Sequence, residues 1–433
     1  MTDLKGKKIF EWVKSALIIL LTLSALLLGW RTGLFNDFFN AIPLFGNVAD
    51  IMRGAAGAGT TESGGVSFQE AARPLTIVIT SEDGSRYGVR NDVGVRNDVY
   101  DRISSIVGEA LGSATIPLEI SEDEWRAALA RPGVYFEYVT PVKLSVLDGW
   151  LSVRLPEMAK DVQLRRVFVA FGEDRSRVYY QDADDLLFFV SDTASSAGKA
   201  QELETYSANG ARFAYETGIS AAENAPYMLI LPGNEYPDVN AAAAGSAEEL
   251  MDIVIYAMGH SYETYTQPYY SSDGALASVG TQFSVSADTT GRVLYRRTEA
   301  VSLNSGQVPD ENEMIEIARK IAAGTIGSIH CDAEVFYESL EHMTDRSLSV
   351  IFGYYIAGGR IRLFDDGCAA KVTFTDGVIT ELELNFRSFF LSGESVKLLP
   401  ELQTLAAAGK EFLLCYSDTG AEKPQPSWVL YNQ

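Results

Sequence analysis

Residues 15–30, SALIILLTLSALLLGW, form the one uncharged and strongly apolar run of this chain. A helix of these residues is about 24 Å long at about 1.5 Å per residue. Val13 and the stem of Lys14 lengthen its apolar surface towards the roughly 30 Å hydrocarbon core of a bilayer. Trp12 and Trp30 bracket the run at positions where aromatic side chains meet the membrane interface. The run therefore predicts a transmembrane anchor.

The charges around this run predict its orientation. Four lysines precede it (Lys5, Lys7, Lys8 and Lys14), and the chain beyond Arg31 is acidic. Positive charge beside a membrane segment favours the cytoplasmic side. We therefore expect a cytoplasmic N-terminus at residues 1–14, a single-pass anchor at 15–30 and an extracytoplasmic remainder. A cleaved signal peptide would need a small-x-small site after the run, which the sequence does not offer. Cleaved secretion and a buried core helix remain the alternatives.

Composition limits the classes of partner. The 433 residues carry a net charge of −23 and are 47% apolar. The acidic surface disfavours nucleic acid and anionic lipid as partners, and the apolar content is that of a folded protein. Three cysteines, Cys331, Cys368 and Cys415, allow at most one bridge and exclude a disulfide framework.

Beyond the anchor, the pattern predicts a linker and two folded regions. Residues 31–73 combine an apolar juxtamembrane segment with a Gly/Ala/Ser-rich flexible stretch. Residues 74–222 form a first extracytoplasmic α+β domain. Residues 223–433 form a second α+β region, divisible into subdomains at 223–305 and 306–433. The fold class expected is α+β, with antiparallel sheets and packed helices.

Local signals place several elements. Apolar spacing predicts helices at 99–111, 121–130, 201–217, 247–256 and 309–323. Ser121 and Glu124 form a capping box at the start of the helix predicted at 121–130. Alternating strands around Asp288–Gly291 and around Asp376-Gly377 predict hairpins. The pentapeptide GVRND occurs at 88–92 and again at 94–98, and we interpret this duplication as a lengthened loop.

Catalytic and metal-binding patterns are weak. Residues 259–263, GHSYE, lack the last glycine of a nucleophile elbow, which disfavours Ser261 as a hydrolase nucleophile. His330, Cys331, His342 and Cys368 lack the close spacing of structural zinc ligands. We therefore expect no enzyme activity, cofactor or metal. Four tyrosines crowd one segment and indicate either an interface or ordinary strand packing: Tyr262, Tyr265, Tyr269 and Tyr270.

Three segments carry a resemblance to a known family. They are PGVYFEY at 132–138 with Pro141 and LSVL at 144–147, FGYYI at 352–356, and AKVTFTDGVIT at 370–380. With the N-terminal anchor and the exported α+β region, the chain resembles the YycH/YycI group, extracytoplasmic regulators of a cell-wall-controlling sensor histidine kinase in low-GC Gram-positive bacteria. The resemblance covers topology, length and domain order over most of the chain. It brings no catalytic residues.

The resemblance implies regulation by contact at the cell membrane, with the kinase or a companion regulator as partner. In the family, membrane helices pair with those of the kinase. Small side chains favour close helix approach in lipid, and the predicted anchor offers four at a possible helix–helix interface: Ala16, Ser24, Ala25 and Gly29. Two other functional classes stay open, a binding module for a cell-wall fragment, peptide or ion, and an envelope hydrolase.

Overall fold

The computed structural model describes residues 68–154, 161–172, 175–183, 186–193, 203, 205–260, 267–272, 274–298 and 308–431. The predicted cytoplasmic segment, the anchor at 15–30 and most of the linker at 31–73 lie outside these residues. Within them, no helix is both long and apolar enough to cross a membrane. The described part is a mixed α+β fold with several antiparallel sheets, which confirms the α+β expectation. The domain limits stay predictions.

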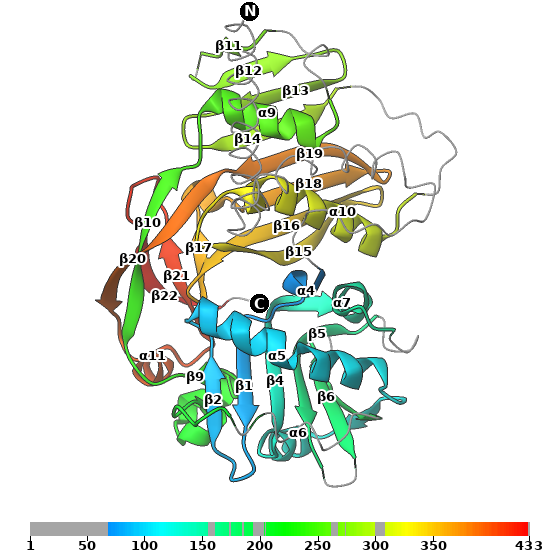
Figure 1. Ribbon diagram of the computed structural model, residues 1–433, viewed down its shortest axis with the longest axis vertical. Helices are drawn as coiled ribbons and strands as arrows, with labels where there is room; N and C mark the ends of the chain where they lie inside the picture. Colours follow the sequence, from blue (N-terminus) through cyan, green and yellow to red (C-terminus); the bar gives the residue numbers. More distant parts are fainter. Residues whose placement is uncertain are drawn as a thin grey trace, which may run out of the picture.

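A seven-stranded sheet contains the strands between residues 76 and 193, and every neighbouring pair in it is antiparallel. Figure 1 shows it in the lower part of the molecule. In spatial order the strands are β2 (Arg86–Val89), β1 (Thr76–Thr80), β4 (Gly133–Lys143), β5 (Gln163–Ala170), β6 (Ser176–Asp182), β7 (Phe188–Thr193) and β3 (Leu118–Ile120).

Helices cover both faces of this sheet. Ile77 and Ile79 pack in one apolar cluster with Ile103 of α5 (Val93–Gly112). Val78 points to the other face and packs in a second cluster with Trp125 of α6 (Glu122–Leu129). The alternation follows from the two-residue period of a strand. The capping box predicted at Ser121 and Glu124 is present at the start of α6, which confirms it.

The GVRND duplication is not a loop extension, so that interpretation is wrong. Its first copy runs from β2 into a short turn, and its second copy forms the first turns of α5. Asp92, the last residue of the first copy, accepts a hydrogen bond from the backbone N of Val95 at 3.0 Å. This N-cap satisfies a free helix N–H, and so α5 begins at Val93 instead of Val99.

The helix predicted at 201–217 is also wrong over residues 205–217. There the chain forms β8 (Arg212–Phe213) and a 3-10 turn (Ala214–Thr217). The Asn209 side chain accepts from Gly88 N at 3.0 Å and donates to Gly88 O at 2.7 Å, so it covers the free edge of β2. Gly210 follows with a φ of 82°. These local bonds compete with a helix.

An eleven-stranded sheet forms the upper part of Figure 1. All its pairs are antiparallel except β17 with β21. Its path is β11 (Tyr269–Tyr270), β12 (Leu276–Val279), β13 (Phe283–Ala287), β14 (Arg292–Arg297), β19 (Val378–Asn385), β18 (Ala370–Thr375), β16 (Ser347–Ile356), β17 (Gly359–Arg362), β21 (Phe412–Ser417) and β22 (Gln425–Leu430), with β15 (Glu334–Thr344) paired to β16.

The predicted hairpins and helices of this part are confirmed. Asp376 and Gly377 have φ values of 52° and 76° between β18 and β19, as a tight turn with two left-handed residues requires. The turn at 288–291 joins β13 to β14. Helices α9 (Ala247–Ala257) and α10 (Glu311–Gly324) lie where the spacing predicted them and contact the sheet.

A long two-stranded ribbon, β10 (Glu235–Ala243) with β20 (Arg387–Lys397), runs along the left side of Figure 1. Below it lies α11 (Glu401–Ala408), which precedes β21. The remaining short elements are α4 (Phe68–Ala71), α7 (Leu144–Leu151), β9 (Leu229–Ile230), and single turns at 220–224, 326–328 and 364–366. One apolar cluster includes residues of both sheets, so the two are packed together.

Candidate functional site

Charged side chains join the N-terminal half (residues 74–222) to the C-terminal half (residues 223–431) of the described chain. In each of the following ion pairs the cation belongs to the N-terminal half and the carboxylate to the C-terminal half. The pairs are Arg90–Glu401, Arg96–Glu334, Lys143–Glu311, Arg165–Glu411 and Arg166–Glu411. We call these residues, together with Glu137 and Gln181, the junction.

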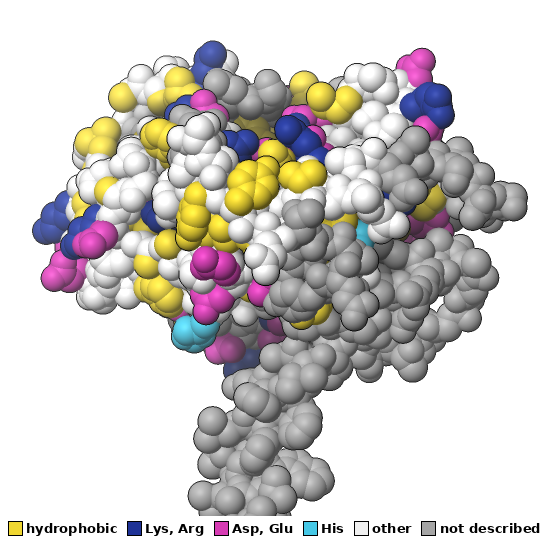
Figure 2. All heavy atoms as spheres, turned by 90° about the horizontal axis from the view of Figure 1, so that it is seen from above, with side chains coloured by type: hydrophobic (Ala, Val, Ile, Leu, Met, Phe, Trp, Pro, Cys, Tyr) yellow, Lys and Arg dark blue, Asp and Glu magenta, His cyan; other side chains and the backbone are white. Residues whose placement is uncertain are grey.

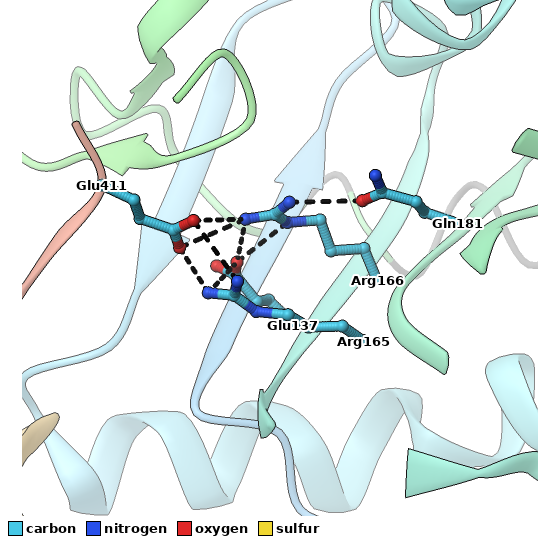
Figure 3. Close-up of polar contacts among 5 residues, drawn as sticks. All are labelled: Glu137, Arg165, Arg166, Gln181 and Glu411. Carbon is cyan, nitrogen blue, oxygen red and sulfur yellow. Dashed lines mark hydrogen bonds and ion pairs between the residues drawn. The ribbon is translucent and has the colours of Figure 1, made fainter. Parts of the chain in front are cut away.

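A β-bulge places two consecutive arginines at the centre of the junction. Successive residues of a regular strand point to opposite faces. The register of β5 against β6 shifts between Leu164 and Arg166, so Arg165 is the extra residue. Arg165 and Arg166 therefore both reach Glu411, which lies between α11 and β21 (Figure 3).

Arg166 is held by three partners. Its Nε donates to Glu137 Oε1 at 2.9 Å, its Nη1 to Gln181 Oε1 at 3.2 Å and its Nη2 to Glu411 Oε1 at 3.2 Å. Glu137 and Gln181 lie opposite Arg166 on β4 and β6, so the sheet register sets this geometry. The two arginine and two glutamate side chains of the cluster balance in charge, as buried ions require.

Arg165 completes the contact with the end of the described chain. Its Nη1 donates to Glu411 Oε2 at 3.3 Å, and its Nη2 contacts the other carboxylate oxygen. Its guanidinium carbon lies 4.4 Å from the ring centroid of Tyr431, a cation–π distance. The C-terminal segment is thus fixed to the N-terminal sheet by charge and by an aromatic ring.

Glu411 and Arg166 are ionised at neutral pH. Burial raises the pKa of Glu411, but the charges of Arg166 and Arg165 outweigh burial and hold it below its ordinary value. Burial lowers the pKa of Arg166, but the nearby carboxylates of Glu137 and Glu411 raise it by more, so the pKa of Arg166 lies above its ordinary value. A general acid or base has a pKa near the working pH. The cluster therefore binds the two halves together and is not suited to proton transfer.

The GVRND duplication supplies two further junction cations. Arg90 of the first copy pairs with Glu401, which is fully buried and also accepts from Leu231 N at 2.9 Å. Arg96 of the second copy is buried, donates to Glu334 Oε1 at 2.6 Å and lies 5.6 Å from the Phe336 ring. The repeated arginine was the sequence signal for the junction, and the loop interpretation missed it.

A cavity of about 50 Å³ adjoins the junction. Arg90, Glu137, Arg165 and Glu411 line it together with Tyr355 and Tyr431, among others. At about 10–15 Å³ for each water, it has room for a few water molecules. Its charged walls come from both halves of the chain.

Among the residues singled out in the sequence, His342 contacts the junction, through Glu311. Ala16, Ser24, Ala25 and Gly29 fall outside the described residues, as do Ser261, Tyr262 and Tyr265. His260 Nε2 lies 2.9 Å from the hydroxyl of Tyr295, and burial and then Arg297 lower its pKa. His342 pairs with Glu311 at 2.9 Å, and burial raises the pKa of the Cys368 thiol to about 12. Within the described part of the chain, no group of three or more His, Cys, Asp or Glu side chains is arranged to hold a metal ion.

Comparison with known proteins finds a shared fold. The described architecture, two packed and mainly antiparallel sheets with helices, is similar to the crystal structure of YycH from Bacillus subtilis, with a TM-score of 0.53 and 10% sequence identity. The match covers 87% of this chain and 98% of that chain. No protein-family model matches the sequence, and no curated protein matches it. The likeness supports a YycH-like fold.

Proposed function

We propose that this protein is a membrane-anchored, extracytoplasmic regulator that modulates a two-component sensor histidine kinase of cell-envelope homeostasis through protein–protein contacts. The fold likeness to YycH carries the proposal, because it extends over nearly the whole of that chain. The segments PGVYFEY, FGYYI and AKVTFTDGVIT, on which the sequence resemblance to the YycH/YycI group rests, lie in β4, β16 and the β18–β19 hairpin.

The proposed role is non-catalytic. The centre of the junction supports it, since the ionised side chains of Arg166 and Glu411 suit binding rather than proton transfer. The apolar run at 15–30 supports a single-pass location with the N-terminus in the cytoplasm. In this proposal the anchor contributes a contact surface for the kinase or a companion regulator, through Ala16, Ser24, Ala25 and Gly29.

Recovery of partners from membranes tests this function. The full chain, tagged at its C-terminus, is purified from detergent-solubilised membranes after cross-linking, beside a variant whose residues 15–30 are replaced by an unrelated apolar helix. We expect a histidine kinase to be recovered with the native anchor and to be lost with the replacement. Ala25→Leu with Gly29→Leu should reduce recovery, whereas Leu27→Ile should not. Absence of any kinase with the native anchor would contradict the proposal.

A further inference from the structure

Helix α9 covers one face of β13 and β14, near the upper end of the molecule in Figure 1. Leu250, Val254 and Met258 belong to the same apolar cluster as Val285 of β13 and Val293 of β14. This packing is what the apolar face of an amphipathic helix provides. The C-terminal end of α9 makes a further contact with the strands, which is aromatic and polar and involves the residue after the helix.

A glycine turn fixes His260 at the end of α9. Gly259 has a φ of 74°, and its N–H donates to Tyr256 O at 2.8 Å. The N–H of His260 donates to Ile255 O at 3.0 Å. These bonds are typical of a helix that ends in a left-handed glycine. They also occupy two of the carbonyl groups that attract a cation to the end of a helix.

The half-buried imidazole of His260 lies nearly parallel to two buried aromatic rings. Its ring centroid is 4.1 Å from that of Phe283, with 21° between the planes, and 5.8 Å from that of Tyr295, with 24° between them. Phe283 and Tyr295 are both buried. Nε2 of His260 lies 2.9 Å from the Tyr295 hydroxyl. This hydroxyl can donate to a neutral imidazole or accept from a protonated one, so the bond does not select the protonation state.

The charged group on this face of the strands is a cation. Arg297 is the cross-strand neighbour of Phe283 and lies two residues after Tyr295, so all three share the face that α9 covers. The other titratable groups of α9 are Glu248, Glu249 and Asp252 in its first two turns and Tyr256 in its last turn. The residues of β13 on this face, 283, 285 and 287, are apolar. Burial, and then the charge of Arg297, lower the pKa of His260 from its ordinary value of 6.5.

We propose that His260 makes an acid-sensitive contact, which holds the C-terminal end of α9 on β13 and β14 at neutral pH and loosens when the imidazole is protonated. The neutral ring fits against Phe283, whereas the imidazolium must recover water and move away from the cation of Arg297.

The direction of the pH response follows from the same geometry. A group whose pKa is lower in the folded protein than in the unfolded protein stabilises the fold above its unfolded pKa, and this stabilisation is lost as the pH falls through the folded pKa. The contact should therefore be complete at about pH 7 and weaken below about pH 6. The inference goes beyond the proposed function and needs no kinase. Only the exposure of His260 to external acid rests on the predicted extracytoplasmic location.

Histidine is rare in this chain, so its titration can be followed one side chain at a time. The chain has three histidines, His260, His330 and His342, and little of the histidine colour appears among the described atoms of Figure 2. NMR of the full chain in detergent micelles, with carbon-13 in histidine alone, measures the pKa of each imidazole. His260→Phe assigns the signal of His260 by its loss.

The two neighbouring arginines of β14 provide a matched pair of variants. We expect the pKa of His260 to lie below about 6.5 and to rise in Arg297→Gln, which removes the neighbouring cation. Arg296 lies on the opposite face, where it pairs with Glu381 at 3.1 Å. Arg296→Gln should therefore leave the pKa of His260 unchanged. A pKa of His260 at or above about 6.5, or an equal rise in both variants, would overturn the proposal.

Hydrogen exchange measures the loosening itself. Between about pH 7 and about pH 5, the protection factors of the amides in the last turn of α9 and in β13 should fall about threefold in the native chain. They should not fall in His260→Phe, which keeps an aromatic ring but cannot be protonated. His260→Asn, which also does not titrate, replaces it if circular dichroism shows that His260→Phe is unfolded. An equal fall in the native chain and in the variant would overturn the proposal. Kinase recovery from membranes at neutral pH is unaffected by either result, so the two proposals fail separately.

Discussion

Arg166 and Glu411 lie 245 residues apart in the sequence, yet the Nη2 of Arg166 donates to Oε1 of Glu411 at 3.2 Å. The pair joins β5, the central strand of the seven-stranded sheet, to the segment that precedes the last two strands of the other sheet. Burial removes both charged groups from most of their water, so the loss of either partner would leave an uncompensated charge inside the protein. The stability of the junction should therefore depend strongly on Glu411.

Glu411→Gln removes the carboxylate that two buried arginines share. We expect the free energy of unfolding to fall by about 3 kcal/mol, because a buried ion pair broken on one side leaves uncompensated charge. Urea unfolding of the full chain in micelles measures it. Asp192→Asn serves as the control, because Asp192 pairs with Arg177 at an exposed site. This substitution should lower the free energy of unfolding by less than about 1 kcal/mol. Equal losses in the two variants would contradict the assigned burial.

The same carboxylate predicts a response to acid. The pKa of Glu411 is lowered from 4.5, since Arg166 and Arg165 outweigh burial. A carboxyl group whose pKa is lower in the folded protein than in the unfolded protein stabilises the fold at pH values above its unfolded pKa. This stabilisation is lost as the pH falls through the folded pKa. The stability gap between the native chain and Glu411→Gln should therefore be large at about pH 7 and shrink below about pH 4. A gap that stays constant down to about pH 3 would show that Glu411 is not the titrating group.

Gly358 tests the contact between the β16–β17 turn and the GVRND segment. It has a φ of +71°, and a Cβ there would lie 2.7 Å from Cγ and 2.9 Å from O of Arg90. We expect Gly358→Ala to cost about 3 kcal/mol, from backbone strain together with displacement of Arg90. Gly420 has a φ of +83° and open space around it, so Gly420→Ala should cost about 1 kcal/mol from strain alone. Thermal unfolding of both variants measures the difference.

A double-mutant cycle tests whether the repeated arginines are coupled to their acids. Arg90→Met and Glu401→Gln, alone and together, should give a coupling energy of about 2 kcal/mol, because Glu401 is fully buried. The control cycle uses the exposed pair Arg362 and Asp366, in which Nε of Arg362 donates to Oδ1 of Asp366 at 2.6 Å. Its coupling energy should be about 0.5 kcal/mol or less. Similar coupling in both cycles would show that Arg90 is not a junction residue.

Local features of the fold could be predicted from the sequence, and distant ones could not. The Asp376-Gly377 turn and the capping box at Ser121 are fixed by residues within a few positions, and both are confirmed. The sequence predicted that α5 begins at residue 99, because Gly94 and Asn97 weaken the apolar spacing before it. The N-cap at Asp92 stabilises the helix from Val93 in spite of these two residues. The junction joins residues that are distant in the sequence, such as Arg90 and Glu401, which lie 311 residues apart. The repeated arginine of GVRND was the one sequence signal that pointed to it.

The level of the phosphorylated response regulator in living cells tests the proposed function most directly. Cells that lack this protein are compared with cells that carry the native chain or the chain with residues 15–30 replaced. We expect deletion to change the phosphorylated fraction, the native chain to restore it, and the replaced anchor to fail at equal protein abundance. An unchanged phosphorylated fraction after deletion, under conditions in which the kinase is active, would contradict a regulatory role.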